Sequence, residues 1–515
     1  MIPVLDIFAG PGGLSEGFSS VRTKHGQPAF DVVLSIEKNE HAFQTLRLRA
    51  FFRQFSPATL PDDYYSYLRG EVALEELYAR YPAQAKAAES RTWLAELGHK
   101  DTPARTVQER IDAAVGGRNV WVLIGGPPCQ AYSIAGRTKN RSLRTYKPTM
   151  DVRQGLYVEY LKILANHWPA AFVMENVKGL LSAKLRNRRI FRRMLEDLQD
   201  PARALHREGK TTRRMGDHHY RIYSLVEQVK FTDGDLQNSV IRAEEYGIPQ
   251  ARHRIILVGV RSDLEKVVPG ILKPHPLVSA SRVLNGLPPL RSGLSRSADS
   301  ADLWRNSLCG EIYSQWANAG AVHAGGEDVR QCLRRVLNAI RSPAHDRGAE
   351  FVAAEAPTNY ANDWFYDPRL GGVCNHGTRS HMVSDLHRYL YAACYAQVHG
   401  QSPSLRNFPT RLLPAHVSAR TALEEGGNFS DRFRVQVADR PATTVMSHIH
   451  KDGHYYIHPD PMQCRSLTVR EAARLQTFPD NYFFVGPCTE QYIQVGNAGS
   501  PFGATCCSWR SALAG

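Results

Sequence analysis

Short apolar runs alternate with helical patterns through the first half of the chain. Five of these runs have the length and composition of buried strands: residues 4–8, 32–36, 120–124, 171–174 and 255–260. Between the first runs, apolar residues recur at helical spacing, from about residue 14 and again over residues 42–50. Strands that alternate with helices are typical of a parallel sheet with helices on both faces. The pattern therefore predicts an α/β fold, whose functional loops lie at the carboxyl ends of the strands.

The alternation breaks in two long segments. Residues 51–118 are rich in Ala, Glu, Arg and Tyr and predict a mainly helical insertion. Residues 262–435 are rich in Arg, Pro, Gly, Ser and His and predict a separate, mostly irregular domain. Order returns at about residue 436, with a helix expected over Thr468–Thr477. We therefore expect a first domain over residues 1–261, a second over 262–435, and a return to the first over 436–515.

Composition narrows the class of protein. The chain has 515 residues and a formal net charge of +14. A surplus of that size indicates a polyanionic partner, most often nucleic acid, although a merely basic enzyme is the alternative. The nine cysteines are odd in number and scattered, which favours a reducing cytosol over a disulfide framework. No apolar run approaches the ~20 residues that a membrane span needs.

A glycine-rich segment, Asp6-Ile7-Phe8-Ala9-Gly10-Pro11-Gly12-Gly13, follows the first strand and opens a helix. Glycines let a ligand approach the backbone, and a helix amino terminus is electropositive. The segment lacks the GxGxxG dinucleotide pattern, which disfavours NAD. Glu37 ends the second strand, where an acidic side chain typically holds ribose hydroxyls. Together they indicate a nucleoside-containing cofactor; the alternative is a tight turn and a surface glutamate.

The third strand leads directly into Gly125-Gly126-Pro127-Pro128-Cys129-Gln130. Glycines and prolines fix the backbone that presents Cys129 at the carboxyl edge of the sheet. The basic residues that follow, such as Arg137 and Arg141, would stabilise a thiolate. We therefore interpret Cys129 as a nucleophile, against the alternative of a buried structural cysteine.

Two later segments carry polar groups at strand ends. Glu175 and Asn176 end the strand at 171–174, and a carboxyl beside apolar neighbours can stay protonated and donate to a ring nitrogen. Gln250, Arg252 and Arg254 alternate, so in an extended segment they share one face suited to a base edge or a phosphate. The alternatives are a helix-capping Glu-Asn pair and a solvated edge strand.

These blocks, in this order, resemble the cytosine-C5 DNA methyltransferase family of the bacterial restriction-modification type. The matching blocks are FAGPGG at 8–13, Glu37, GGPPCQ at 125–130, ENV at 175–177, QARHR at 250–254, RPATT at 440–444, LTVREAARLQTFP at 467–479 and GNA at 496–498. Each block alone is weakly diagnostic, whereas the ordered set is highly specific. The resemblance covers roughly residues 1–50, 119–182, 240–262 and 432–501.

The resemblance implies a Rossmann-like S-adenosylmethionine-dependent methyltransferase sheet, with target recognition in residues 262–435. The implied reaction transfers a methyl group from S-adenosylmethionine to carbon 5 of a flipped-out cytosine in a specific duplex DNA sequence. Cys129 would attack carbon 6, Glu175 would bind and protonate N3, and Arg252 would bind O2 and help to position the cysteine. The implied partners are double-stranded DNA and a cognate restriction endonuclease, for a cytoplasmic, nucleoid-associated monomer that needs no metal.

The remaining site residues follow from the same blocks. Those expected to bind the cofactor are Phe8, Gly10, Gly12, Gly13, Leu14, Glu37, Pro127 and Asn497. Those expected to bind the substrate are Gln130, Asn176, Val177, Gln250, Arg254, Arg440 and Thr444. Asp101 is a candidate for the acidic residue that contacts adenine in the family, in a region that the insertion disturbs.

Two other readings stay open from the sequence. A tRNA cytosine-C5 methyltransferase shares the cysteine and ENV blocks, but the long segment at 262–435 favours duplex DNA. A catalytically impaired DNA-binding relative is the third reading, because the chain departs from the family pattern after Gly499. The expected terminal helix is weak or missing there, and we hypothesise that residues 499–515 are degenerate and pack poorly.

Overall fold

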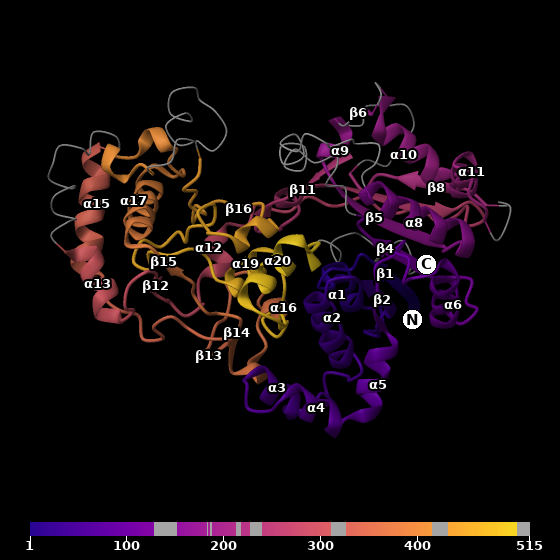
Figure 1. The fold of residues 1–515 in the computed structure, drawn as a ribbon, viewed down its shortest axis with the longest axis horizontal. Coiled ribbons are helices and arrows are strands. Elements are labelled where there is room, and N and C mark those ends of the chain that lie inside the picture. The colour runs from indigo at the N-terminus through magenta and orange to yellow at the C-terminus, as the bar shows by residue number, and fades with distance from the viewer. Residues whose placement is uncertain are drawn as a thin grey trace.

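The chain folds into two lobes that lie side by side (Figure 1). The computed structural model describes residues 1–127, 152–182, 184–185, 188–212, 218–226, 239–310, 326–414 and 431–501. We call residues 1–261 the sheet lobe and residues 278–501 the second lobe. An exposed linker over residues 262–277 joins them.

The sheet lobe is built on an eight-stranded sheet with the order β3-β2-β1-β4-β5-β11-β8, and β9 also pairs with β11. Its strands are β1 (Ile2–Ile7), β2 (Phe30–Glu37), β3 (Thr92–Leu94), β4 (Val122–Gly125), β5 (Ala171–Val177), β8 (Tyr220–Tyr223), β9 (Val240–Arg242) and β11 (His253–Arg261). Strands β1 to β5 pair in parallel. The α/β fold class is confirmed for this lobe.

Strand β11 departs from the predicted parallel sheet. It runs antiparallel to β5, β8 and β9. The expectation of a parallel strand at residues 255–260 is therefore wrong. An apolar run indicates that a strand is buried. It carries no information about whether the strand runs parallel or antiparallel to its neighbours.

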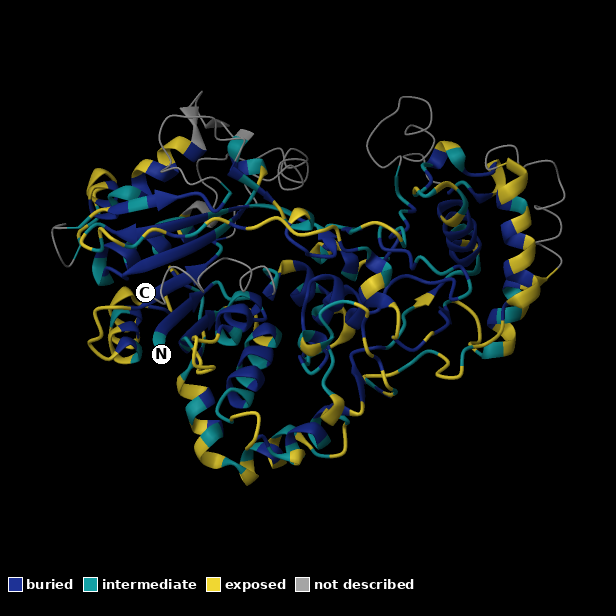
Figure 2. Cartoon of the chain, turned by 180° about the vertical axis from the view of Figure 1, so that it is seen from behind, coloured by how far each residue is buried: buried dark blue, intermediate teal, exposed yellow. Residues whose placement is uncertain are grey.

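Helices cover both faces of this sheet. They are α1 (Gly13–Ser20), α2 (Glu40–Phe52), α6 (Ala104–Val115), α8 (Val152–His167), α9 (Gly179–Ser182), α10 (Ile190–Gln199) and α11 (Pro201–Arg207). Because side chains alternate along a strand, Leu5 and Ile7 pack with α6 and α8, whereas Val4 packs with Phe18 of α1. The central strands are buried on both faces (Figure 2), as in other helix-covered sheets.

The predicted helical insertion is shorter than expected. Residues 53–91 form α3 (Asp62–Leu68), α4 (Leu74–Arg80) and α5 (Pro82–Ser90). The next residues belong to the sheet, since β3 pairs with β2 and α6 packs Val107 and Ile111 against Leu34. The run at 92–94 is too short to stand out as a strand in the sequence.

The second lobe lacks the alternation of strands and helices. Its helices are α12 (Ala280–Leu284), α13 (Ala301–Cys309), α15 (Gly326–Ala339), α16 (Asn362–Phe365), α17 (Val383–His399), α19 (Val469–Leu475) and α20 (Cys488–Asn497). Its strands form two-stranded pairs, β12 (Gly293–Leu294) with β15 (Ser380–His381) and β13 (Phe351–Ala353) with β14 (Gly372–Cys374). A third pair joins the lobes: β10 (Gln250–Ala251) pairs with β16 (Ala442–Thr443). In the sheet lobe, β6 (Lys184–Leu185) pairs with β7 (Arg188–Arg189).

Residues 436–501 pack mainly within the second lobe. Val283 of α12 shares an apolar core with Leu467, which precedes α19, and with Ala472 within α19. Thr468 and Glu471 form a capping box that begins α19, close to the predicted helix start. The segment reaches the sheet lobe through β16 and through α20, which contacts α2. It therefore joins the two lobes.

We predict that Gly259→Ala destabilises the sheet lobe. A Cβ at Gly259 would lie 2.0 Å from the ring of Phe172 on β5, so the variant should lose about 1–3 kcal/mol of unfolding free energy. Gly155→Ala is the matched control, because its Cβ would meet no described atom within 4 Å on an exposed turn of α8. Urea unfolding of both variants measures the difference, and equal stabilities would contradict the prediction.

Candidate active site

The loop after β1 is held by a carboxylate at the end of β2. Phe8, Gly10 and Gly12 have positive φ angles of 55°, 57° and 94°, which turn the chain sharply into α1. The backbone N–H of Gly10 donates to Glu37 Oε2 at 2.8 Å. Oε1 of the same carboxylate accepts from the N–H groups of Lys38 and Asn39. Glu37 therefore fixes the loop, and it keeps room for a further donor, because a carboxylate accepts about four hydrogen bonds.

Asp6 is a buried acid beneath this loop. Its Oδ2 accepts a hydrogen bond from the Ser15 hydroxyl of α1. Within the described part of the chain, Oδ1 has no hydrogen-bond partner. Burial raises the pKa of Asp6 to about 7, and the Ser15 hydrogen bond and the Arg53 charge offset only part of that rise. A large fraction of Asp6 is therefore protonated near neutral pH.

The chain leaving β4 passes directly beside β5. A Cβ at Gly126 would lie 3.0 Å from the backbone oxygen of Glu175, so the close approach favours glycine. Pro127 follows and is buried. Cys129 and Gln130 lie outside the described residues. The described backbone ends at Pro127, two residues before Cys129.

Glu175 near the end of β5 lies beside two guanidinium groups. Arg254 Nε donates to Glu175 Oε1 at 3.0 Å. Arg252 Nε lies 3.9 Å from the same oxygen. The Asn176 side-chain oxygen accepts from the N–H of Val177, so Asn176 shapes the end of the strand. The structure thus brings together the carboxyl and both arginines that the sequence proposed.

The two arginines have different surroundings. Arg252 is only 4% exposed, and its Nη1 and Nη2 donate to the carbonyls of Val445 (3.1 Å) and Ala498 (2.8 Å). Burial and the nearby Arg254 lower the pKa of Arg252 to about 9, although Glu175 opposes the shift. The side chain of Arg254 is 18% exposed and anchors through His253 O and Glu175. Arg252 is thus fixed within the protein, whereas Arg254 is the arginine closer to solvent.

Gln250 does not lie on the face of the arginines. It is fully buried, its amide nitrogen donates to Leu475 O and Gln476 Oε1, and its oxygen accepts from Val445 N. Its amide is used within the protein, which argues against contact with a base. The alternation of residues 250–254 failed as a guide because Arg252 N–H turns back to Gln250 O.

Two further predicted substrate residues, Thr444 and Arg440, differ in their contacts and exposure. The Thr444 hydroxyl donates to the carbonyl of Ala251 at 2.6 Å, which holds β16 against the arginine-bearing segment. Arg440 is exposed on the surface of the second lobe. Thr444 therefore supports Arg252 indirectly, and Arg440 remains available to a ligand.

The end of α20 closes the site. Asn497 is exposed, and Ala498 O accepts from both Arg252 and Gln476. A Cβ at Gly13 would lie 2.1 Å from Gly499 O, and one at Gly499 would lie 2.9 Å from Glu175 Oε2. Residues 498–499 thus lie between the glycine loop and Glu175. Residues 502–515, which include most of the hypothesised degenerate tail, lie outside the described residues.

Several residues that help to build this site were not named as candidates from the sequence, although Gln476 and Ala498 lie in two of the matching blocks. Val445, Gln476 and Ala498 act through hydrogen bonds to Arg252 or Gln250, two of them through backbone carbonyls, which any residue could supply. Glu96 follows β3 and pairs with Lys38 at 2.9 Å, close to Glu37. Its place at a strand end makes it a better candidate for cofactor contact than Asp101, which is strongly exposed.

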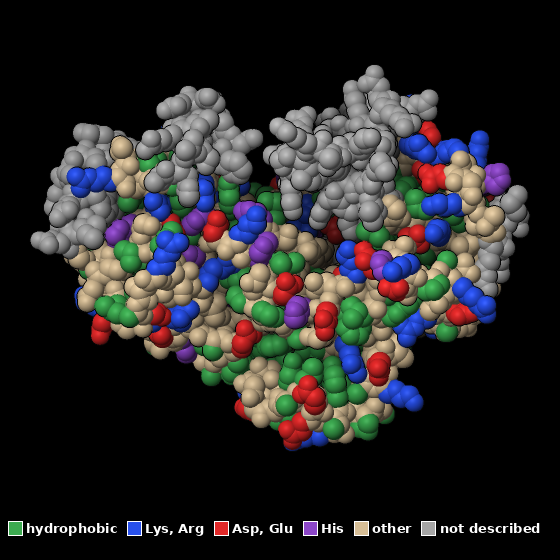
Figure 3. Space-filling view, in the orientation of Figure 1, with side chains coloured by type: hydrophobic (Ala, Val, Ile, Leu, Met, Phe, Trp, Pro, Cys, Tyr) green, Lys and Arg blue, Asp and Glu red, His purple; other side chains and the backbone are tan. Residues whose placement is uncertain are grey.

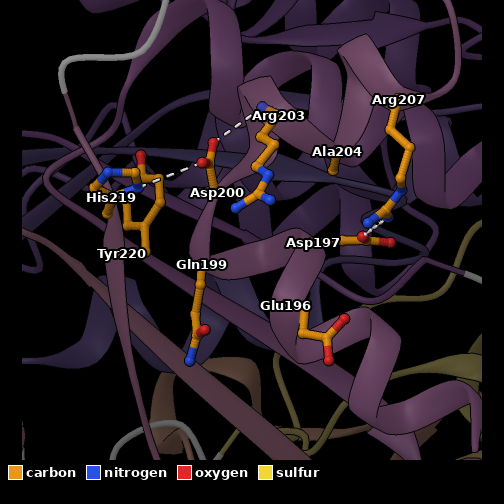
Figure 4. A pocket seen from close by; sticks show the side chains of 9 residues that line it. All are labelled: Glu196, Asp197, Gln199, Asp200, Arg203, Ala204, Arg207, His219 and Tyr220. Atoms are coloured by element: carbon orange, nitrogen blue, oxygen red, sulfur yellow. Dashed lines mark hydrogen bonds and ion pairs between the residues drawn. The ribbon is translucent and has the colours of Figure 1, made fainter.

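A separate hollow of about 550 Å³ lies on the surface near α10, α11 and the start of β8 (Figure 4). Two of its lining carboxylates pair with basic side chains, Asp197 with Arg207 and Asp200 with His219. Tyr220 on β8 is level with the beginning of β5, whereas Glu175 lies toward the end of β5. The hollow is therefore separate from the candidate active site.

Comparison with known families shows the family of the chain. The family model described as C-5 cytosine-specific DNA methylase matches residues 99–201, 216–343 and 357–504. The chain belongs to this family. The recognition made from the sequence is confirmed, and the chain is a DNA cytosine-C5 methyltransferase.

Individual relatives span nearly the same length. The type II methyltransferase M.Bpa9945I of Bacillus paralicheniformis is 29% identical and covers 97% of this chain and 96% of its own. The DNA (cytosine-5-)-methyltransferase M.ApeKI of Aeropyrum pernix is 26% identical, over 74% of this chain and 79% of its own. A prophage-encoded E. coli protein assigned as a DNA modification methyltransferase has a TM-score of 0.48 at 17% identity, covering 98% of this chain and 97% of its own.

The residues that the structure describes hold neither a metal-binding cluster nor a membrane-spanning helix. No set of three or more His, Cys, Asp or Glu side chains is arranged there to hold a metal ion. Cys374 bonds to Leu68 O, and the ring nitrogens of His376 bond to the Thr468 hydroxyl and to Pro288 O. None of the helices described is long and apolar enough to cross a membrane.

We predict that Asp6 makes stability fall as pH rises. Because its folded pKa is raised to about 7 from 3.8, the folded state holds the proton more tightly. The contribution is complete below about pH 4 and is lost as pH rises through about 7, on the order of 1.4 kcal/mol per pKa unit.

Asp6→Asn should therefore lose less stability than the wild type between pH 5 and pH 8. Urea unfolding at both pH values measures this difference, with Asp101→Asn as the exposed control. An Asp6→Asn variant with the same pH dependence as the wild type would show that Asp6 titrates normally in the folded protein.

Proposed function

We propose that the enzyme transfers the methyl group of S-adenosylmethionine to carbon 5 of a cytosine rotated out of a specific duplex DNA sequence, through covalent attack by Cys129. The observation that carries this proposal is the convergence of Arg252 and Arg254 on Glu175 Oε1 beside the backbone that leads to Cys129. Carbon 5 of cytosine is a poor nucleophile, so it needs activation by a second group.

The reaction begins at carbon 6 of the cytosine. The Cys129 thiolate bonds to carbon 6, and electrons move through carbon 4 to N3, which takes a proton from Glu175. Carbon 5 of the resulting enamine would then take the methyl group of the sulfonium cofactor, whose sulfur–methyl bond would break to leave a neutral thioether, and the N3 proton returns to Glu175. Loss of the carbon-5 proton to a base then re-forms the 5,6 double bond and expels the thiolate. The product is 5-methylcytosine.

The surroundings of the arginines support an exchange of their expected roles. Arg252 uses both terminal nitrogens on protein carbonyls, which suits a positioning residue. Arg254 bonds to Glu175 through Nε and to a backbone carbonyl through Nη1. Its Nη2 and its greater exposure make it the better candidate to bind O2 of the base.

The residues at the glycine loop fit a nucleoside cofactor. A Cβ at Gly10 would meet no described atom within 4 Å, which leaves room for a ligand over the loop. Glu37 retains acceptor capacity for ribose hydroxyls. S-adenosylmethionine, when bound, supplies an electrophilic methyl group. Phe8, Gly12, Gly13, Leu14, Pro127 and Asn497 would border it.

Duplex DNA is the proposed form of the substrate. The net charge of +14 suits a polyanion, and carbon 5 must be reached in an extruded base. Residues 262–435 would read the sequence, and the exposed Arg440 would contact a phosphate. We propose that the enzyme is a monomer and acts on chromosomal DNA in the cytoplasm. Its partner would be a restriction endonuclease that recognises the same DNA sequence.

Cys129→Ala should abolish methyl transfer to duplex DNA, because carbon 5 then stays unactivated. Tritium transfer from labelled cofactor measures this, with transfer RNA as the competing substrate. DNA in which 5-fluorocytosine replaces the target should trap the wild-type enzyme covalently, because carbon 5 then has no proton to lose. Methyl transfer that survives Cys129→Ala would refute the mechanism.

The exchange of arginine roles gives a separate prediction. Arg254→Gln should lower kcat on the order of 10²–10⁴-fold with a small change in stability. Arg252→Gln should lower the unfolding free energy by about 3 kcal/mol, because it leaves buried carbonyls and Glu175 short of a partner. Steady-state kinetics and urea unfolding of both variants test this, and the reverse pattern would restore the role first assigned to Arg252.

A further inference from the structure

We infer that residues 53–91, which we call the brace, position the recognition segment 262–435 against the sheet lobe. The inference rests on the proposed function for its consequence in DNA binding. In Figure 1 the brace helices α3 and α4 lie at the bottom of the molecule, between α5 and the strands β13 and β14. The brace touches both lobes there.

On the sheet-lobe side, the brace packs through aromatic side chains onto α2. Phe51 contacts the ring of Tyr78 at 5.1 Å between centroids, and Arg47 stacks on the same ring at 5.2 Å. Leu48 and Phe51 share one apolar core with Leu68 and Leu77 of the brace. This side of the brace is therefore a buried, packed interface.

On the other side, the brace binds a short stretch of the recognition segment. Tyr65 OH donates to Asp367 Oδ2 at 2.7 Å. Arg369 donates to Leu60 O (2.8 Å) and Asp62 Oδ1 (2.7 Å), and its guanidinium stacks on Tyr65 at 4.8 Å. These contacts reach Asp367 and Arg369 directly, and Asn481 of residues 436–501 donates to the same Asp367 Oδ2 at 2.8 Å.

That stretch leads to the core of the recognition segment. Residues 367–374 continue into β14, then into β15, which pairs with β12, and then into the 17-residue helix α17. The covalent linker between the lobes is largely exposed, as Val268 (45%) and Leu277 (62%) are, although Leu272 is buried and its N–H donates to Leu225 O at 2.7 Å. The hydrogen bonds between the brace and Asp367 and Arg369 therefore help to fix the position of α17 relative to Glu175.

The charge of the brace separates this role from direct DNA contact. Residues 53–91 carry six acidic and five basic side chains in a chain whose net charge is +14. Acidic side chains gather at the bottom of the face in Figure 3. A surface of that composition does not attract a polyanion, so the brace acts through packing.

The test compares two double variants of matched chemistry. Tyr65→Phe/Arg369→Ala removes contacts between the brace and the recognition segment. Tyr81→Phe/Arg80→Ala is the control, because both of its side chains bond to Asp63 inside the brace. We expect the first variant to raise the KM for cognate DNA roughly fivefold to tenfold. Its kcat and its affinity for S-adenosylmethionine should stay within twofold of the control.

Hydrogen exchange of the DNA-free protein gives the second readout. The first variant should exchange faster than the control over residues 366–399, which include α17. A KM for DNA within twofold of the control, or unchanged exchange over α17, would overturn the inference. If the double variant does not fold, Tyr65→Phe against Tyr81→Phe decides with the same readouts. A wild-type protein that methylates no duplex would refute the proposed function, while hydrogen exchange would still decide the role of the brace.

Discussion

A guanidinium group withdrawn from water needs acceptors, and Arg252 finds them 193 and 246 residues farther along the chain. Those acceptors are the carbonyls of Val445 and Ala498, which the second lobe supplies. The sheet lobe alone therefore cannot complete the surroundings of Glu175. The pairing of β10 with β16, the buried amide of Gln250 and the close contact of Gly499 with Gly13 all follow from the need to bring these carbonyls to Arg252.

Buried ion pairs also occur in the second lobe, within residues 464–482. Arg465 and Arg474 are fully buried, and they pair with Glu471 and Asp480. Arg474 also donates to the carbonyls of Val283 and Ala356. Charge-assisted hydrogen bonds depend on geometry, so this network helps to orient residues 464–482 against the rest of the lobe.

The sequence anticipated the parts of the protein whose signal is local. The strand ends at Glu37 and Glu175, the glycine loop and the start of α19 depend on nearby residues, and all lie close to where the pattern placed them. The direction of β11 and the membership of β3 in the sheet depend on pairing between distant segments. The side chain of Gln250 bonds to Leu475 and Gln476. The alternation of residues along one strand carries no information about such distant partners.

The difference between Arg252 and Arg254 shows the same limit. Both occupy equivalent positions in the motif, and both reach Glu175. Only the carbonyls at Val445 and Ala498 distinguish them, and a backbone carbonyl leaves no mark in the sequence. The sequence motifs thus predicted which side chains lie together at the site. Contacts with distant segments determine the role of each side chain.

The dependence of Arg252 on Ala498 also bears on the order in which the protein is made. A ribosome completes the glycine loop, Cys129, Glu175 and both arginines long before it reaches residue 498. Until that residue emerges, the guanidinium of Arg252 lacks one of its two carbonyl partners. The nascent chain therefore carries every reactive group in an unfinished setting, and the site reaches its final arrangement only after residue 498 has joined the fold.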